Sequence, residues 1–139
     1  MASVESRLTM CQKAAELLEW MEIHDHDVTA EEPLYSWKTA EFFREQYSGQ
    51  NVTLYWLMGT DQWNALTRWN RHAHLASLVE FIVFTRGGEG LEDHPYAHNV
   101  IQGSHPASAT AIRQALAQGE TPAWLHPEVR TWIREKGEY

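Results

Sequence analysis

Two short apolar segments constrain the fold of this chain more than any other feature. Residues 53–58 (TLYWLM) and residues 81–84 (FIVF) have the length of strands and carry no charge. The first is followed by the turn Gly59-Thr60-Asp61, and the second leads to a turn that contains Gly87 and Gly88. Strands that are apolar on both faces are typical of parallel sheets covered by helices on both sides. We therefore predict an α/β fold with a mostly parallel sheet.

The remaining segments alternate as such a sheet requires. Their predicted order begins with a helix that Ser3 caps and that runs to about Trp20, a strand over residues 21–28 and a helix that Ser36 caps. Short helices over residues 61–66 and 72–78, a loop over residues 91–98, a strand over residues 99–102 and two closing helices follow. The expected buried positions are Val4, Leu8, Cys11, Ala15 and Leu18 on the first helix, Ala40, Phe43 and Tyr47 on the second, and Val129, Trp132 and Ile133 on the last. No repeat or linker divides the 139 residues, so we expect a single domain over residues 1–139.

Composition argues against several classes of protein. The formal net charge of −8 opposes a broad nucleic-acid surface, which needs clustered Lys and Arg. The single cysteine, Cys11, cannot form an internal disulfide and fits a reducing cytoplasm. No apolar run approaches the length of a membrane span. We expect a soluble, cytoplasmic protein without a nucleic-acid or membrane partner.

The turn after the first apolar strand is a candidate ligand site. In open α/β sheets, ligands bind beyond the carboxyl ends of the strands. Gly59 would let a ligand approach the backbone, and the Asp61 carboxylate could accept hydrogen bonds from a ribose hydroxyl. The alternative is an ordinary strand-to-helix turn in which Asp61 is the N-cap.

A second candidate site opens the first of the two closing helices. Ser108 and Thr110 precede Arg113 by about one helical turn, so two hydroxyls, free backbone N–H groups and a guanidinium suit a phosphate group. Helix capping by the same hydroxyls is the alternative.

Two further features allow more than one interpretation. Trp69, in a polar segment before a helix, could stack on a planar ring or anchor the core. His24, Asp25, His26 and Asp27 resemble metal ligands, but an exposed strand end explains them equally well, and no third ligand is visible. We assign no metal site and no catalytic residue.

Taken in order, six short motifs over nearly the whole chain resemble those of bacterial nicotinate-nucleotide adenylyltransferases, members of the nucleotidyltransferase superfamily. Residues 6–10 (SRLTM) resemble the family's HRLxM helix, residues 33–36 (PLYS) its PSYT turn, and residues 57–61 (LMGTD) its xxGxD strand end. Residues 66–69 (LTRW) resemble its LPxW, residues 84–87 (FTRG) its xxRPG, and residues 107–113 (ASATAIR) its ISSTxIR, and the family's usual ending follows over residues 125–139.

The resemblance implies a partial Rossmann-like fold and a set of roles. Tyr35 and Ser36 would form the nicotinate pocket, with Trp69 stacked on the pyridine ring. Gly59 and Asp61 would meet the nucleotide ribose, and ATP would be bound by Ser108, Thr110 and Arg113. The implied substrates are ATP, with its Mg²⁺, and nicotinate mononucleotide, and the implied products are deamido-NAD and pyrophosphate.

The chain also departs from the family. Leu34, Asn70 and Ala109 replace a Ser, an aromatic and a second Ser. No Gly-Gly-x-Phe-Asp-Pro segment and no His-x-Gly-His motif occurs in the 139 residues. The resemblance therefore implies the carboxyl-terminal two-thirds of the domain, without its first two strands.

Missing strands would expose apolar sheet edges, so we expect self-association or pairing with a chain that supplies them. Two other functions stay open: a non-catalytic nucleotide-binding or assembly module, and a sister nucleotidyltransferase with another phosphorylated substrate.

Overall fold

A computed structural model describes residues 2–86, 90–104 and 108–137. The chain forms two compact units, a terminal unit made of Met1–Thr29 with Pro106–Tyr139 and a central unit made of Ala30–His105. The expectation of a single domain stays a prediction. Within the described ranges, no helix is both long enough and apolar enough to cross a membrane.

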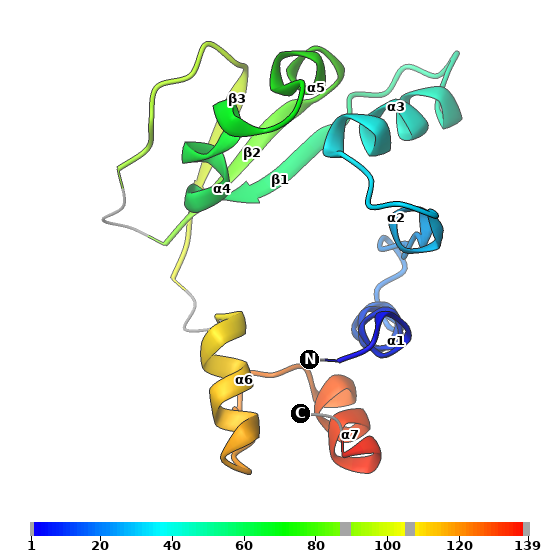
Figure 1. Ribbon diagram of the computed structural model, residues 1–139, viewed down its shortest axis with the longest axis vertical. Coiled ribbons are helices and arrows are strands. Elements are labelled where there is room, and N and C mark those ends of the chain that lie inside the picture. The colour runs from blue at the N-terminus through cyan, green and yellow to red at the C-terminus, as the bar shows by residue number, and fades with distance from the viewer. Residues whose placement is uncertain (1, 87–89, 105–107, 138–139) are drawn as a thin grey trace. The chain divides into compact units, whose positions relative to one another are not determined.

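The central unit contains a parallel sheet of three strands in the order β1-β2-β3 (Figure 1). The strands are β1 (Tyr55–Gly59), β2 (Glu80–Thr85) and β3 (His98–Gln102). Both apolar segments and the segment predicted from residue 99 are therefore strands, and Met58 of β1 pairs with Val83 of β2. All three carboxyl ends lie at the same edge of the sheet, because the strands are parallel.

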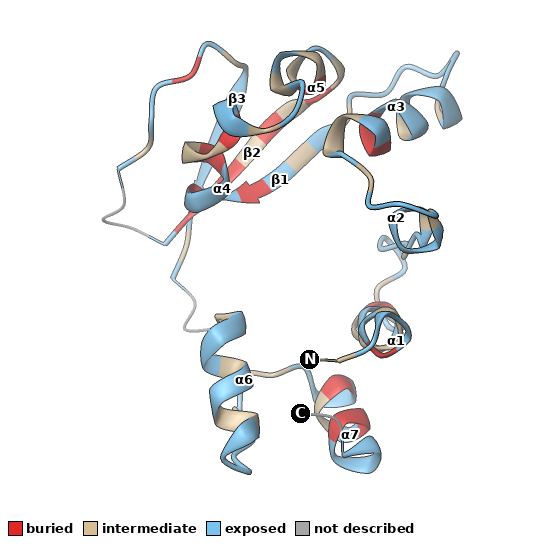
Figure 2. Ribbon diagram, viewed as in Figure 1, coloured by how far each residue is buried: buried red, intermediate tan, exposed pale blue. Residues whose placement is uncertain are grey.

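Helices of the central unit pack on one face of this sheet. They are α3 (Ser36–Gln46), α4 (Thr60–Asn64), the 3₁₀ turn η1 (Leu66–Arg68) and α5 (His72–Leu78). Trp63 of α4, Leu66 of η1 and Leu75 of α5 are fully buried against Phe81 and Val83 of β2. Alternate residues of a strand face opposite sides, so Phe81 and Val83 project into this core together. Buried and partly buried positions alternate along β2 (Figure 2). The predicted α/β class, a parallel sheet flanked by helices, is confirmed.

The opposite face and the outer edge of β1 carry exposed apolar side chains. Leu57 is 66% exposed, Tyr55 54% and Ile101 48%. Among the described strands, β1 pairs with β2 alone. This is the kind of apolar edge from which we predicted self-association.

The terminal unit is helical. Its elements are α1 (Val4–Ala15), α2 (His26–Thr29), α6 (Ala109–Ala117) and α7 (Pro127–Lys136). The core of the terminal unit contains the three residues of the last helix that were predicted to be buried, Val129, Trp132 and Ile133. Met10 and Ala14 of α1 pack against this core.

Two predictions for the amino-terminal segment are wrong. The first helix ends at Ala15 rather than near Trp20, which is 78% exposed. Cys11, predicted to be buried, is exposed, and its neighbour Met10 packs against the core of the terminal unit instead. Residues 21–28 form no strand. Instead, the Asp25 carbonyl accepts hydrogen bonds from the backbone N–H groups of the next turn, which starts α2. A local alternation of polar and apolar residues makes a strand only where a neighbouring strand completes its hydrogen bonds.

Candidate functional site

A cavity of about 280 Å³ brings together two segments that are far apart in the sequence. Leu34, Tyr35 and Ser36 line it from one side, and Trp69 and Asn70 from the other. The structure thus places all three residues predicted to bind the nicotinate ring, Tyr35, Ser36 and Trp69, around one hollow.

Local backbone geometry creates both walls of this cavity. Tyr35, with an extended backbone, is the N-cap of α3 in place of the predicted Ser36, and its side chain makes no capping hydrogen bond. Trp69 is also extended and ends η1. Arg71 adopts the left-handed conformation, with φ 51°, and is the only described residue other than glycine with a positive φ. This conformation costs a non-glycine residue roughly 1–2 kcal/mol, so packing around Arg71 must maintain it.

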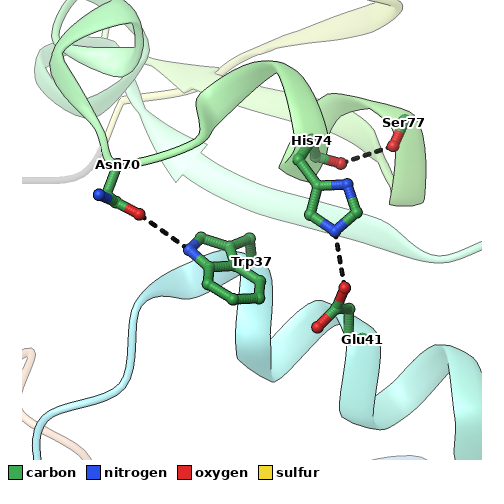
Figure 3. Close-up of polar contacts among 5 residues, drawn as sticks. All are labelled: Trp37, Glu41, Asn70, His74 and Ser77. Carbon is green, nitrogen blue, oxygen red and sulfur yellow. Dashed lines mark hydrogen bonds and ion pairs between the residues drawn. The ribbon is translucent and has the colours of Figure 1, made fainter.

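Polar contacts join α3 to the segment that follows Trp69 (Figure 3). The Trp37 indole Nε1–H donates to Asn70 Oδ1 at 3.0 Å, and His74 Nε2 lies 2.7 Å from Glu41 Oε1. The Arg71 guanidinium stands 4.4 Å from the centre of the Trp37 ring, a cation–π contact. These bonds tie α3 to the segment from Asn70 through α5.

The lining suits a small planar ring with polar substituents. Trp69 offers an aromatic surface, Leu34 an apolar one, and Ser36 and Asn70 offer hydrogen-bonding groups. Ligand pockets usually measure about 300–1,000 Å³, so this cavity is the size of one ring rather than of a whole dinucleotide.

The carboxyl end of β1 leaves open space where a ligand was predicted. A Cβ atom built on Gly59 would meet no other atom within 4 Å, and the φ of Gly59 is an ordinary −85°. The protein itself therefore does not require glycine at this position. Gly59 and Asp61 are not among the described residues that line the 280 Å³ cavity.

The alternative reading of Asp61 as an N-cap is wrong. Gly59 is the N-cap of α4, and Asp61 lies in the first turn with its side chain exposed. Between them, Thr60 is 5% exposed, and its Oγ1 has no hydrogen-bond partner among the described residues.

The predicted phosphate-binding residues open α6 in the terminal unit. Ser108 caps this helix, since its Oγ accepts a hydrogen bond from the Ala111 N–H at 3.0 Å. Thr110 and Arg113 are exposed on the first turns. Capping is therefore confirmed, while phosphate binding stays a prediction. Ala107, which begins this motif, and Gly87 and Gly88 of the earlier turn lie outside the described residues.

The possible metal ligands do not form a centre. In the part of the chain that the structure describes, no three His, Cys, Asp or Glu side chains gather as a metal site. The pairing expected of His24 and His26 depended on a strand, and His26 instead begins α2. His24 Nε2 lies 3.5 Å from Glu22 Oε2.

Sequence reasoning missed several residues that shape the cavity and the core. Trp37 and Arg71 had no predicted role, although their positions next to Ser36 and Asn70 place them beside the motif residues. His94, in the segment predicted as a loop over residues 91–98, is buried and donates from Nε2 to the Trp63 carbonyl oxygen at 3.0 Å.

Comparison with known proteins agrees with this architecture. The nicotinic acid mononucleotide adenylyltransferase of Plasmodium falciparum, solved in complex with APC, matches with a TM-score of 0.77 over 100% of this chain and 77% of that chain. Its sequence is 16% identical, so this likeness shows a shared Rossmann-like nucleotidyltransferase fold. A family model described as cytidylyltransferase-like matches residues 1–115, and the chain therefore belongs to the cytidylyltransferase-like family.

Proposed function

We propose that this protein acts as a nicotinate-nucleotide adenylyltransferase in NAD biosynthesis. The observation that carries the proposal is the cavity in which Tyr35, Ser36 and Trp69 meet, since the resemblance assigns these residues to the nicotinate pocket. Membership of the cytidylyltransferase-like family supports nucleotidyl transfer as the reaction class.

In the proposed reaction, a phosphate oxygen of nicotinate mononucleotide attacks the α-phosphorus of ATP. The new P–O bond yields deamido-NAD, and the bond from the α-phosphorus to the bridging oxygen breaks to release pyrophosphate. The pyridine ring occupies the cavity against Trp69, and Gly59 and Asp61 meet a ribose. Ser108, Thr110 and Arg113 bind ATP through their hydroxyl, backbone and guanidinium groups.

Mg²⁺ enters this proposal with the phosphates of ATP. Because the described residues provide no cluster of three metal-ligating side chains, we assign it no protein ligands. When bound, Mg²⁺ would neutralise phosphate charge. We also place the protein in the cytoplasm, on its single cysteine, Cys11.

Binding and turnover need separate measurements, because the 139 residues include no His-x-Gly-His motif. We would titrate nicotinate mononucleotide and ATP into the protein by calorimetry, and follow pyrophosphate release with both substrates and Mg²⁺. Replacing Trp69 with Leu should weaken nicotinate mononucleotide binding about tenfold, because stacking on an aromatic side chain contributes roughly 1–3 kcal/mol. Trp20→Leu is the control, since Trp20 is 78% exposed and lies in the other unit.

The outcomes distinguish the enzyme from a non-catalytic module. Binding of both ligands with release of pyrophosphate supports the enzyme. Binding without release supports a nucleotide-binding module. Failure to bind nicotinate mononucleotide, or equal weakening by both tryptophan variants, overturns the proposal.

One observation favours a second candidate, a sister nucleotidyltransferase with another phosphorylated substrate. Leu34 and Asn70, which replace the family's Ser and aromatic, both line the cavity. Stronger binding of a phosphorylated substrate without a pyridine ring would support this candidate.

A further inference from the structure

The orientation of the Asn70 side-chain amide follows from its partner. An indole N–H can only donate a hydrogen bond, so Trp37 requires an acceptor, which is Asn70 Oδ1 at 3.0 Å. The Nδ2 amino group consequently points away from Trp37 (Figure 3). Asn70 thus presents donors, and no acceptor, on its free side.

Those donors are available to a ligand. Asn70 lines the cavity and is exposed, and its Nδ2 donates to no acceptor among the described residues. Arg71, the next residue, has a left-handed backbone, and its guanidinium contacts the ring of Trp37. This contact helps to hold Asn70 against Trp37. A ligand group that meets Asn70 here should therefore be an acceptor.

The surroundings also favour negative charge in the ligand. The first turn of α3, whose N-cap Tyr35 makes no side-chain capping bond, lines the opposite wall and directs the positive end of the helix dipole there. Arg71 and Lys38 lie over Trp37, at 4.4 and 5.7 Å from its ring centre. The nearby carboxylate of Glu41 is occupied by His74, at 2.7 Å.

We infer that Asn70 determines which ring substituent the cavity accepts, donating from Nδ2 to the carboxylate of nicotinate. This inference rests on the proposed function. A carboxylate accepts a charge-assisted hydrogen bond, whereas the carboxamide of nicotinamide accepts a neutral one that is roughly half as strong. The protein should therefore bind nicotinate mononucleotide about tenfold more tightly than nicotinamide mononucleotide.

The sharpest test is Asn70→Asp, which keeps the shape of the side chain and an oxygen for Trp37 but replaces the donor with a carboxylate. Calorimetric titration at neutral pH with both mononucleotides should show affinity for nicotinate mononucleotide falling about tenfold or more. The nicotinamide compound, whose amide can donate to Asp, should lose less, so the preference for nicotinate mononucleotide should shrink toward equal affinity. Asn70→Ala, which removes the donor and also the acceptor of the Trp37 indole N–H, should bring the two affinities close together.

Asn51→Asp is the matched control because it adds the same charge elsewhere. Asn51 is exposed beyond the carboxyl end of α3, whereas the cavity lies at its amino end. An 11-residue helix spans roughly 16 Å. This variant should keep the wild-type preference.

The two proposals fail in different ways. If the wild-type protein binds neither mononucleotide, the proposed function is wrong. If it binds nicotinate mononucleotide but Asn70→Asp and Asn70→Ala leave the ratio of affinities unchanged, the function stands and the role of Asn70 is overturned. Near-ultraviolet circular dichroism of the tryptophans verifies that each variant is folded.

Discussion

Replacing Gly59 with alanine should separate ligand binding from stability at the carboxyl end of β1. The added methyl group would meet no protein atom within 4 Å, and the backbone, at φ −85° and ψ 169°, is one that alanine adopts freely. If the fold requires glycine at position 59, the substitution should lower the free energy of unfolding. If only a ligand requires it, the substitution should weaken ligand binding and leave the protein stable.

The substitution should have opposite effects on the stability of the protein and on its affinity for the nucleotide. Alanine at a compatible position restricts the unfolded chain and stabilises a protein by about 0.4–1 kcal/mol. A methyl group placed where a nucleotide lies against the backbone should cost binding about 1–3 kcal/mol, by analogy with overpacked protein cores. A loss of 1.4 kcal/mol corresponds to about tenfold in affinity.

Chemical denaturation and calorimetric titration with ATP and nicotinate mononucleotide measure the two effects on the same protein. Gly90→Ala is the control, since a Cβ at Gly90 also meets no atom within 4 Å and Gly90 has no predicted role in binding. Unchanged affinity in Gly59→Ala would refute the ligand-approach role. A large loss of stability would refute the reading of the local geometry.

Four more substitutions test other parts of the structure. Ser108→Ala and Ser3→Ala each remove a cap bond of 3.0 Å and should each cost about 1 kcal/mol in denaturation, but only Ser108→Ala should weaken ATP binding; equal ATP affinity in both would contradict the phosphate role. Thr60→Val should raise the free energy of unfolding by about 1 kcal/mol, because it removes a buried hydroxyl without a described partner, and destabilisation would show that this oxygen is satisfied. Leu57→Lys changes a side chain that is 66% exposed, so stability should move by less than about 0.5 kcal/mol while self-association in sedimentation experiments decreases; an unchanged association state would place the interface elsewhere.

Much of the fold could be predicted from sequence because the relevant signals are local. The apolar runs before Gly59 and after Glu80 are strands, and Ser3 and Ser108 cap helices through their own backbone neighbours. The prediction of a strand over residues 21–28 is wrong because a strand depends on a partner distant in the chain, which local alternation cannot specify.

The candidate site was predictable only in its parts. Tyr35, Ser36 and Trp69 were identified by resemblance, and the structure brings them to one cavity. Nothing in the local pattern indicated that Trp37 would bond to Asn70, because the two are separated by 33 positions and meet only when α3 packs against α5.

The sequence by itself determined the α/β class, the two apolar strands and the helix caps at Ser3 and Ser108, because periodicity and capping act over a few residues. Tertiary structure decided which face of the sheet became the core, how the two walls of the cavity met and which way the Asn70 amide points. Each of these depends on contacts between residues distant in the chain, and the last depends on one indole N–H that can only donate.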